Sequence, residues 1–549
     1  MLHPVRDLTT FKVLVFRTSE PRPSQPPAIA GCSQMPSDSS ILFESPDSTI
    51  FLIDIPTSIS LAQKLRPTPE PEASRDTKAT SDSKQHKRRH LISSEPLKVP
   101  YPAQNEPKSE AARAKILAQI PQSEREIHQT IRPLVFNALD EIRSHRSQKT
   151  LQWCLPRHTI EEEKANDVNA PDQPDQDGYL TQAANYVLGK RKRVTGKGSL
   201  ESASSRSKAP GDEGQIKINP QHLERHRASR RGWTEPIPPL ILSPGANRFE
   251  DEEALCNNLV KNTSSEPATI EIRRSFAMNP LRHSIHADEG QNGDSDQAQI
   301  VINVPPLSRF ILCDLPISMP LHHRESMNPI PGLSPDKKFN LMIFDPPWSN
   351  RSVRRSGHYQ TQKYLESELL TAYLSSVLTV HSYQPTKDEP PLQDTRSNLS
   401  IAAIWTTNSA KSRKAAYGSL AGAGFSICEE WIWIKTTTNG EPVTLLDGLW
   451  RKPYEVLVIG KRQPVFDCEG HDGHRDCEGV RRVIAAVPDV HSRKPILKEV
   501  LERVFFKSAS DNPVRYSGLE VFARNLTAGW WACGNEVLNF NYEDWWFDE

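Results

Sequence analysis

The sequence lacks a net charge, long apolar runs and a dense set of cysteines. Its 68 basic residues balance 68 acidic ones, so any affinity for nucleic acid must come from local patches or a partner chain. No stretch of about 20 apolar residues suggests a membrane span, and the N-terminus lacks the basic-then-apolar order of a signal peptide. Eight scattered cysteines give no disulfide framework, so we expect a reducing intracellular compartment.

Proline, in contrast, is abundant. The chain has 46 prolines, and only 36% of its residues are hydrophobic. This composition predicts one well-packed domain joined to long stretches that pack poorly. Nine of the 11 tryptophans lie between Trp348 and Trp546. Large aromatic side chains build cores and base-stacking surfaces, so we place the functional domain in that part of the chain.

The pattern of apolar and polar residues divides the chain into four regions. We expect a strand-containing segment at 1–63, a disordered linker at 64–110, an accessory region with long disordered stretches at 111–335, and the folded domain at 336–549. Two similar apolar runs, at 49–56 and 308–316, predict edge strands that end at proline. A helix is predicted over 109–146. Basic clusters at 87–89, 190–193 and 230–231 favour nuclear import through at least one of them, with phosphate-binding patches and an ordinary solvated linker as the alternatives.

In the last region, strands alternate with helices. Strands are predicted at 339–344, 399–406, 425–435, 454–460, 483–487 and 518–522, and helices at 363–380, 410–423 and 495–506. This order predicts an α/β fold with a mainly parallel sheet covered by helices on both faces. Insertions are expected near 384–398 and 463–480. The second contains Cys468, His471, His474 and Cys477, whose tight spacing favours a polar loop over a zinc site, so we expect no metal.

The motif Asp345-Pro346-Pro347-Trp348 directly follows the predicted strand at 339–344. It therefore lies at the carboxyl edge of the sheet, where ligands bind. Two prolines fix two φ angles and remove two amide donors, so the loop is rigid. The Asp345 carboxylate and the Pro346 carbonyl can accept both hydrogens of an exocyclic adenine amine, and Trp348 offers a face for the base. These four residues are the candidate catalytic motif.

Five segments in the same order, at 345–356, 431–435, 451–455, 488–495 and 518–538, resemble the eukaryotic N6-adenine methyltransferases of the MT-A70 family, and within it the methyltransferase-like 4 subfamily. The resemblance implies a Rossmann-like methyltransferase fold and S-adenosylmethionine as methyl donor. It also implies which residues form the site. The donor would be bound by Asp345, Lys494, Arg524, Asn525, Asn535 and Glu536.

Residues after the motif are expected to hold the nucleic acid. Arg354 and Arg355 could grip phosphates beside the target nucleotide, together with Asn350 and Ser352. Lys452 and Tyr454 precede a predicted strand and could face the target nucleotide, although Tyr454 could equally belong to the core.

The function expected from these features is methylation of adenine N6 in nucleic acid. The subfamily resemblance favours adenosine in RNA, particularly 2′-O-methylated adenosine of a small nuclear RNA. DNA adenine is the alternative acceptor, and a catalytically inactive nucleic-acid-binding adaptor with the same fold is the alternative of another class. We expect a nuclear protein, with the cytoplasm as the alternative location, and a monomer, with a complex with a partner protein as the alternative.

Overall fold

The computed structural model describes residues 39–65, 89–103, 106–148, 152–159, 238–273, 299–318, 328–348, 367–384, 399–449, 451–462, 479–506 and 515–548. Its main feature is a 12-stranded sheet with the order β1-β2-β15-β13-β14-β12-β11-β16-β17-β10-β7-β5. Seven of its eleven strand pairings are parallel. The mainly parallel sheet expected from the sequence is therefore present.

The strands of this sheet come from the whole described chain. In sheet order they are β1 Ile41–Glu44, β2 Ile50–Ile53, β15 Val480–Ala486, β13 Phe425–Lys435, β14 Tyr454–Arg462, β12 Ser400–Thr406, β11 Leu341–Phe344, β16 Gly518–Val521, β17 Trp531–Gly534, β10 Arg309–Leu312, β7 Leu259–Asn262 and β5 Leu240–Leu242. Segments assigned from the sequence to three separate regions thus share one sheet.

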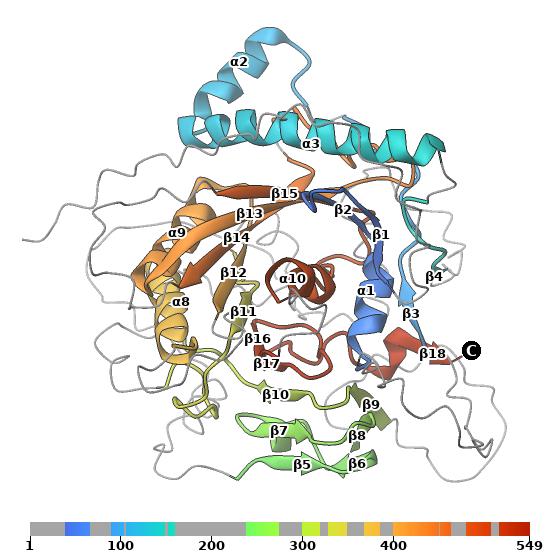
Figure 1. Cartoon of the computed structure of the whole chain (residues 1–549), viewed down its shortest axis with the longest axis vertical. Coiled ribbons are helices and arrows are strands. Elements are labelled where there is room, and N and C mark those ends of the chain that lie inside the picture. The colour runs from blue at the N-terminus through green and yellow to red at the C-terminus, as the bar shows by residue number, and fades with distance from the viewer. Residues whose placement is uncertain are drawn as a thin grey trace, which may run out of the picture.

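Helices cover both faces of the sheet. The helices α3 (Gln122–Gln148), α8 (Ser367–His381) and α9 (Ala410–Gly422) share one hydrophobic cluster with the sheet, and α1 (Ile55–Ala62) and α10 (Lys498–Phe505) share the other. In Figure 1 the strands curve around α10, with α8 and α9 on the outer side. No helix in the described ranges is long and apolar enough to cross a membrane.

Two small sheets complete the fold. The strands β6 (Gly245–Phe249), β8 (Ala268–Arg273) and β9 (Gln299–Val304) form one, and β18 (Trp546–Asp548), β3 (Arg89–Ser93) and β4 (His158–Thr159) form the other. The 3-10 helices η1 (Glu253–Leu255) and η4 (Glu543–Trp545) lie beside them in the chain. The described residues 89–103 belong to the segment expected to be a disordered linker. That expectation is wrong for them, because distant parts of the chain bind their backbone.

Proline positions explain two further differences from the sequence predictions. The strands β2 and β10, expected at sheet edges, each lie between two neighbours. Pro56 and Pro316 follow these strands, so neither proline removes a ladder hydrogen bond. Pro56 is the second residue of α1, in the first turn after the N-cap Asp54. The single helix expected at 109–146 is two helices, α2 (Glu110–Gln119) and α3, because Pro121 forces Ile120 into an extended conformation.

Candidate active site

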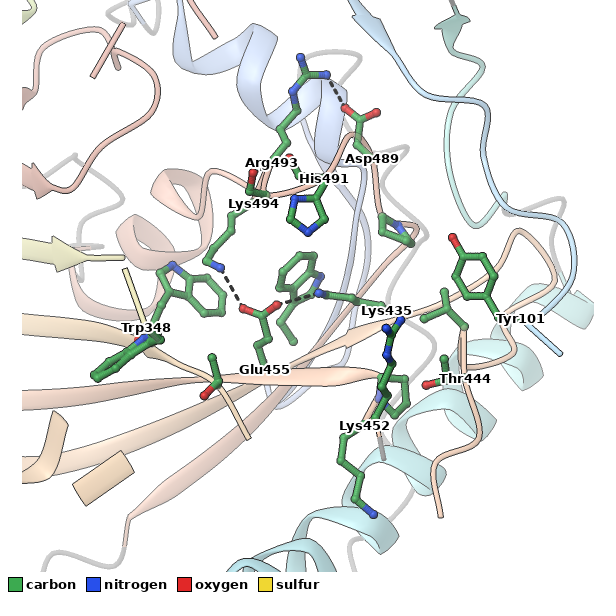
Figure 2. A pocket seen from close by; sticks show the side chains of 18 of the residues that line it. Tyr101, Trp348, Lys435, Thr444, Lys452, Glu455, Asp489, His491, Arg493 and Lys494 are labelled. Carbon is green, nitrogen blue, oxygen red and sulfur yellow. Dashed lines mark hydrogen bonds and ion pairs between the residues drawn. The ribbon is translucent and has the colours of Figure 1, made fainter. Parts of the chain in front are cut away.

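A cavity of about 460 Å³ opens at the carboxyl edge of the main sheet. The segments after β11, β12, β13 and β15 contribute to its wall, as does the start of the antiparallel strand β14. Residues 101–103 and 106 close another side. The cavity therefore lies where open α/β sheets bind ligands. Figure 2 shows Trp348 and Tyr101 at opposite sides of it.

The motif after β11 forms a short, internally bonded turn. The Trp348 amide donates to the Pro346 carbonyl at 2.8 Å, and the Trp348 indole Nε1 donates to the Trp405 carbonyl at 2.7 Å. The Pro346 carbonyl, which was expected to accept a hydrogen from a ligand, therefore already accepts one from a local amide. One lone pair of that carbonyl remains for a ligand, and the indole is fixed in orientation beside Asp345.

Four charged groups meet beside this turn. The Lys494 Nζ lies 3.3 Å from Asp345 Oδ1 and 2.9 Å from Glu455 Oε2, and Lys435 Nζ lies 2.7 Å from Glu455 Oε1. The Lys494 ammonium also lies 5.3 Å from the Trp405 ring centroid, within cation–π range. Figure 2 shows Lys494 and Lys435 converging on Glu455.

These contacts keep the cluster ionised. Burial opposes the charge on Glu455, but the ammonium groups of Lys435 and Lys494 outweigh it and hold the pKa of Glu455 well below its usual value. Burial likewise opposes the charge on Lys494, yet Asp345 and Glu455 raise the pKa of this lysine above its usual range. The site thus presents a fixed ammonium next to the Asp345 carboxylate.

A second, smaller cavity of about 40 Å³ adjoins the first, and both are lined by Asp345, Lys494 and Arg524. Glu520 on β16 and Asn525 line only the smaller one. Burial, together with the nearby Asp345 carboxylate, raises the pKa of Glu520 to about 8. The buried Asn525 Nδ2 has no hydrogen-bond partner among the described residues. An unpaired buried amide donor is costly, so this side of the site suits a ligand with an acceptor atom.

The residues expected to bind the donor are only partly brought together. Lys494, Arg524 and Asn525 line a cavity with Asp345, whereas Asn535 and Glu536 line neither of the two. Asn535 directly follows β17, and Glu536 Oε2 lies 3.3 Å from Arg524 Nε. Glu536 is therefore connected to the site through Arg524.

The residues expected to hold nucleic acid lie in different places in the structure. Lys452 lines the larger cavity, and Figure 2 shows its ammonium pointing away from the Glu455 cluster. Tyr454 does not face the cavity. It is 2% exposed in the core, and its hydroxyl lies 2.9 Å from His128 Nδ1, so the core interpretation holds. Asn350, Ser352, Arg354 and Arg355 lie outside the described residues, as do Cys468, His471, His474 and Cys477.

Several cavity residues were missed by sequence reasoning. Glu455, Lys435 and Glu520 lie in the matching segments, but no role was expected for them. A charged side chain inside an otherwise apolar strand was the available signal, because burial of a charge requires a partner or a function. Tyr101 and Glu106 gave no signal, since they lie in a proline-rich stretch far away in sequence.

Comparison with known proteins finds a methyltransferase family and several N6-adenine methyltransferases. The MT-A70 family model matches residues 339–536. The N6-methyladenosine RNA methyltransferase MTA1 of Cryphonectria parasitica is 35% identical over 213 residues, which cover 38% of this chain and 55% of the relative. The human N(6)-adenine-specific methyltransferase METTL4 is 31% identical over 245 residues, 44% of each chain. A Caenorhabditis elegans DNA N6-methyl methyltransferase is 26% identical over 300 residues, 53% of this chain and 70% of the relative.

The matches to MTA1 and METTL4 thus span about half the length of those proteins. In chain order, the matched range runs from β11 to β17, and it contains the Asp345 turn and the Lys494 loop. The methyltransferase fold expected from the sequence is confirmed by this match. Residues 339–536, which contain most of this site, are therefore similar to the MT-A70 family.

Proposed function

We propose that this protein transfers a methyl group from S-adenosylmethionine to the N6 amine of adenine in nucleic acid, with adenosine in RNA as the favoured acceptor. The observation that carries the proposal is the position of Asp345. Asp345 lines two adjoining cavities, and its carboxylate lies 3.3 Å from the half-buried Lys494 ammonium and three residues before a fixed indole. An acceptor and a donor can therefore approach the same carboxylate from two sides.

On the acceptor side, the turn supplies the groups that an adenine amine requires. The nitrogen lone pair is delocalised into the ring, and acceptors for its two hydrogens favour the pyramidal form that can react. Asp345 provides one acceptor, and the remaining lone pair of the Pro346 carbonyl provides the other. The Trp348 face can hold the base, and the indole hydrogen bond to Trp405 keeps that face in place.

On the donor side, the chain presents groups that match an amino acid with a carboxylate and an ammonium. Lys494 or Arg524 can pair with the carboxylate, and Asp345 and Glu520 can face the ammonium. The unpartnered Asn525 Nδ2 can donate to a further acceptor atom. When bound, S-adenosylmethionine supplies an electrophilic methyl group. The task of these side chains is to orient the donor toward the Asp345 turn, because positioning carries much of the rate of such transfers.

The names of the relatives support an adenine acceptor, and they include both RNA and DNA methyltransferases. MTA1 is named for RNA, and the nematode relative is named for DNA. DNA adenine is therefore the second candidate acceptor. The whole-chain composition has no net charge, so the polymer must be held by local contacts such as those of Lys452.

Mass spectrometry of nucleosides tests this proposal. The purified chain is incubated with S-adenosylmethionine and with matched RNA and DNA oligonucleotides, with and without a 2′-O-methyl group on the target adenosine. We expect N6-methyladenosine from RNA, most of all from the 2′-O-methylated form. Product from DNA alone would favour the second acceptor. Donor binding without any product would favour the inactive adaptor.

Nuclear localisation is a separate proposal, supported by the basic clusters at 190–193 and 230–231. Replacing both clusters with alanines in a fluorescently tagged chain should reduce the nuclear signal. The monomeric state expected from the sequence stays a prediction.

A further inference from the structure

The loop between β15 and α10 carries Lys494 and lines the larger cavity along residues 488–494. Its backbone is not relaxed, since Ser492 has a φ of 65°, in the left-handed region that non-glycine residues rarely adopt. Such a conformation persists only where surrounding contacts fix it. Several contacts that hold this loop come from residues outside the matched MT-A70 range, namely Ile92, Ser94 and Arg157.

Two arginines and one aspartate form a buried cluster behind the loop. Arg493 Nη1 donates to Asp489 Oδ2 at 2.7 Å, and Arg157 Nη1 lies 3.9 Å from Asp489 Oδ1. The three side chains are at most 1% exposed. The Arg493 guanidinium also lies over the Phe540 and Trp545 rings. Figure 2 shows Arg493 and Asp489 on the side of the loop away from Glu455, opposite Lys494.

The cluster ties the loop to an N-terminal arm, defined here as residues 92–94 and 152–157. Arg157 donates to the carbonyls of Val487 at 2.8 Å and Pro488 at 2.9 Å. Arg493 donates to the Ile92 carbonyl at 2.9 Å. The Ser94 amide donates to Asp489 Oδ1 at 2.8 Å. The hydrogen bonds therefore run from the arm to both ends of the loop.

Stability alone does not account for such a cluster. Desolvating three charges is expensive, and apolar residues of similar volume often give equal or greater stability. Forked guanidinium donors do specify the direction of the carbonyls that they bind. A role in fixing the backbone conformation before Lys494 explains both the burial and the choice of arginine.

We propose that Arg157, Asp489 and Arg493 are positioning residues that hold the loop so that Lys494 points at Asp345 and Glu455. The N-terminal arm then contributes to donor binding by positioning the loop that carries Lys494. This inference rests on the proposed function, because it assigns Lys494 to the donor. Its test must therefore distinguish a loss of loop positioning from an absence of donor binding.

Calorimetric titration of S-adenosylmethionine into Arg157→Lys provides that test. Lysine keeps the positive charge but cannot reach both carbonyls, so we expect donor affinity to fall about tenfold or more at a temperature where the variant is folded. Arg143→Lys is the matched control. Arg143 also joins the N-terminal region to the domain, through the Gly440 carbonyl at 2.7 Å, which lies outside this loop. The donor affinity of Arg143→Lys should therefore match the wild type. If Arg157→Lys unfolds at the assay temperature, Arg493→Lys takes its place with the same expectation.

A double-mutant cycle with Lys494→Met separates positioning from general destabilisation. If Arg157 acts through Lys494, the Arg157→Lys change should cost little further affinity in the Lys494→Met background. Additive losses, or a donor affinity of Arg157→Lys equal to the wild type, would overturn the inference. An absence of donor binding by the wild type would instead contradict the proposed function.

Discussion

The two loops that meet at Asp345 are held in different ways. The turn after β11 is stiffened by its own sequence, with two prolines and an indole bonded to the neighbouring strand. The loop before Lys494 has a strained residue, and it is held by buried arginines whose partners lie more than 300 residues away in the chain. A local motif thus supplies the reactive groups, and long-range contacts supply the alignment. Substitutions in the Asp345 turn should therefore reduce turnover or acceptor binding, whereas substitutions that release the Lys494 loop should reduce donor affinity.

The largest effect is expected at Asp345. Replacing it with alanine removes a preorganised polar group at the reacting amine, so turnover should fall by ~10²–10³. Asp447→Ala is a suitable control, because Asp447 is 57% exposed and pairs with Arg132 at 2.7 Å, a kind of contact worth only ~0–1 kcal/mol. Steady-state kinetics measures both. Equal turnover of Asp345→Ala and wild type would remove Asp345 from the mechanism.

Replacing Trp348 should weaken binding of the acceptor oligonucleotide more than binding of the donor. Trp348→Ala removes a stacking face worth ~1–3 kcal/mol per base, so we expect a higher KM for the oligonucleotide and little change in donor affinity. Trp348→Phe keeps a ring but loses the hydrogen bond to Trp405, and it should recover part of the loss. A change confined to donor affinity would assign Trp348 to the other side of the site.

Glu455 tests the charge balance around Lys494. Glu455→Gln leaves the Lys435 and Lys494 ammonium groups without the carboxylate that joins them. The free energy of unfolding should fall by about 1–3 kcal/mol, as for other hydrogen bonds to charged groups. Thermal denaturation measures the loss, and Glu271→Gln, at a surface pair with Arg248, is the control. A melting temperature equal to that of the control variant would show that Glu455 is not needed to hold the two lysines.

Glu520 should give an effect that is seen only as a pH dependence of stability without ligand. Its pKa is raised from 4.5 to about 8 in the folded protein. Between these values the folded state retains a proton that the unfolded state has released, so stability falls as pH rises through that window and levels off above it. Melting curves of Glu520→Gln should show a weaker decline from pH 5 to 8. An identical pH profile for the variant and the wild type would mean that Glu520 titrates normally.

Much of the domain could be predicted from sequence because its elements are locally encoded. The aromatic and β-branched run at 425–435 coincides with β13, and the acidic-diproline motif lies at a strand end as expected. The face of each strand could not be predicted where both sides are buried. In β14, Tyr454 and Val456 face one core cluster and Leu457 faces the other, so the apolar pattern gave no reason to choose Glu455 over Tyr454 as the cavity residue.

The contribution of the N-terminal arm was also beyond sequence reasoning. Residues 89–103 have the proline-rich, polar composition of a linker, and their order depends on hydrogen bonds to partners such as Val443 and Asp489. Extended segments that are held by such long-range contacts have no local periodicity to detect. The same reasoning explains why Arg157 gave no signal, although its side chain is almost completely buried.

A crystal structure with S-adenosylhomocysteine bound would test the central claim most directly. We predict its amino-acid end between Asp345, Lys494 and Asn525, with the sulfur facing the Trp348 side of the larger cavity. A ligand bound elsewhere, with Lys494 still paired only to Asp345 and Glu455, would contradict the claim that the two loops form one methyl-transfer site.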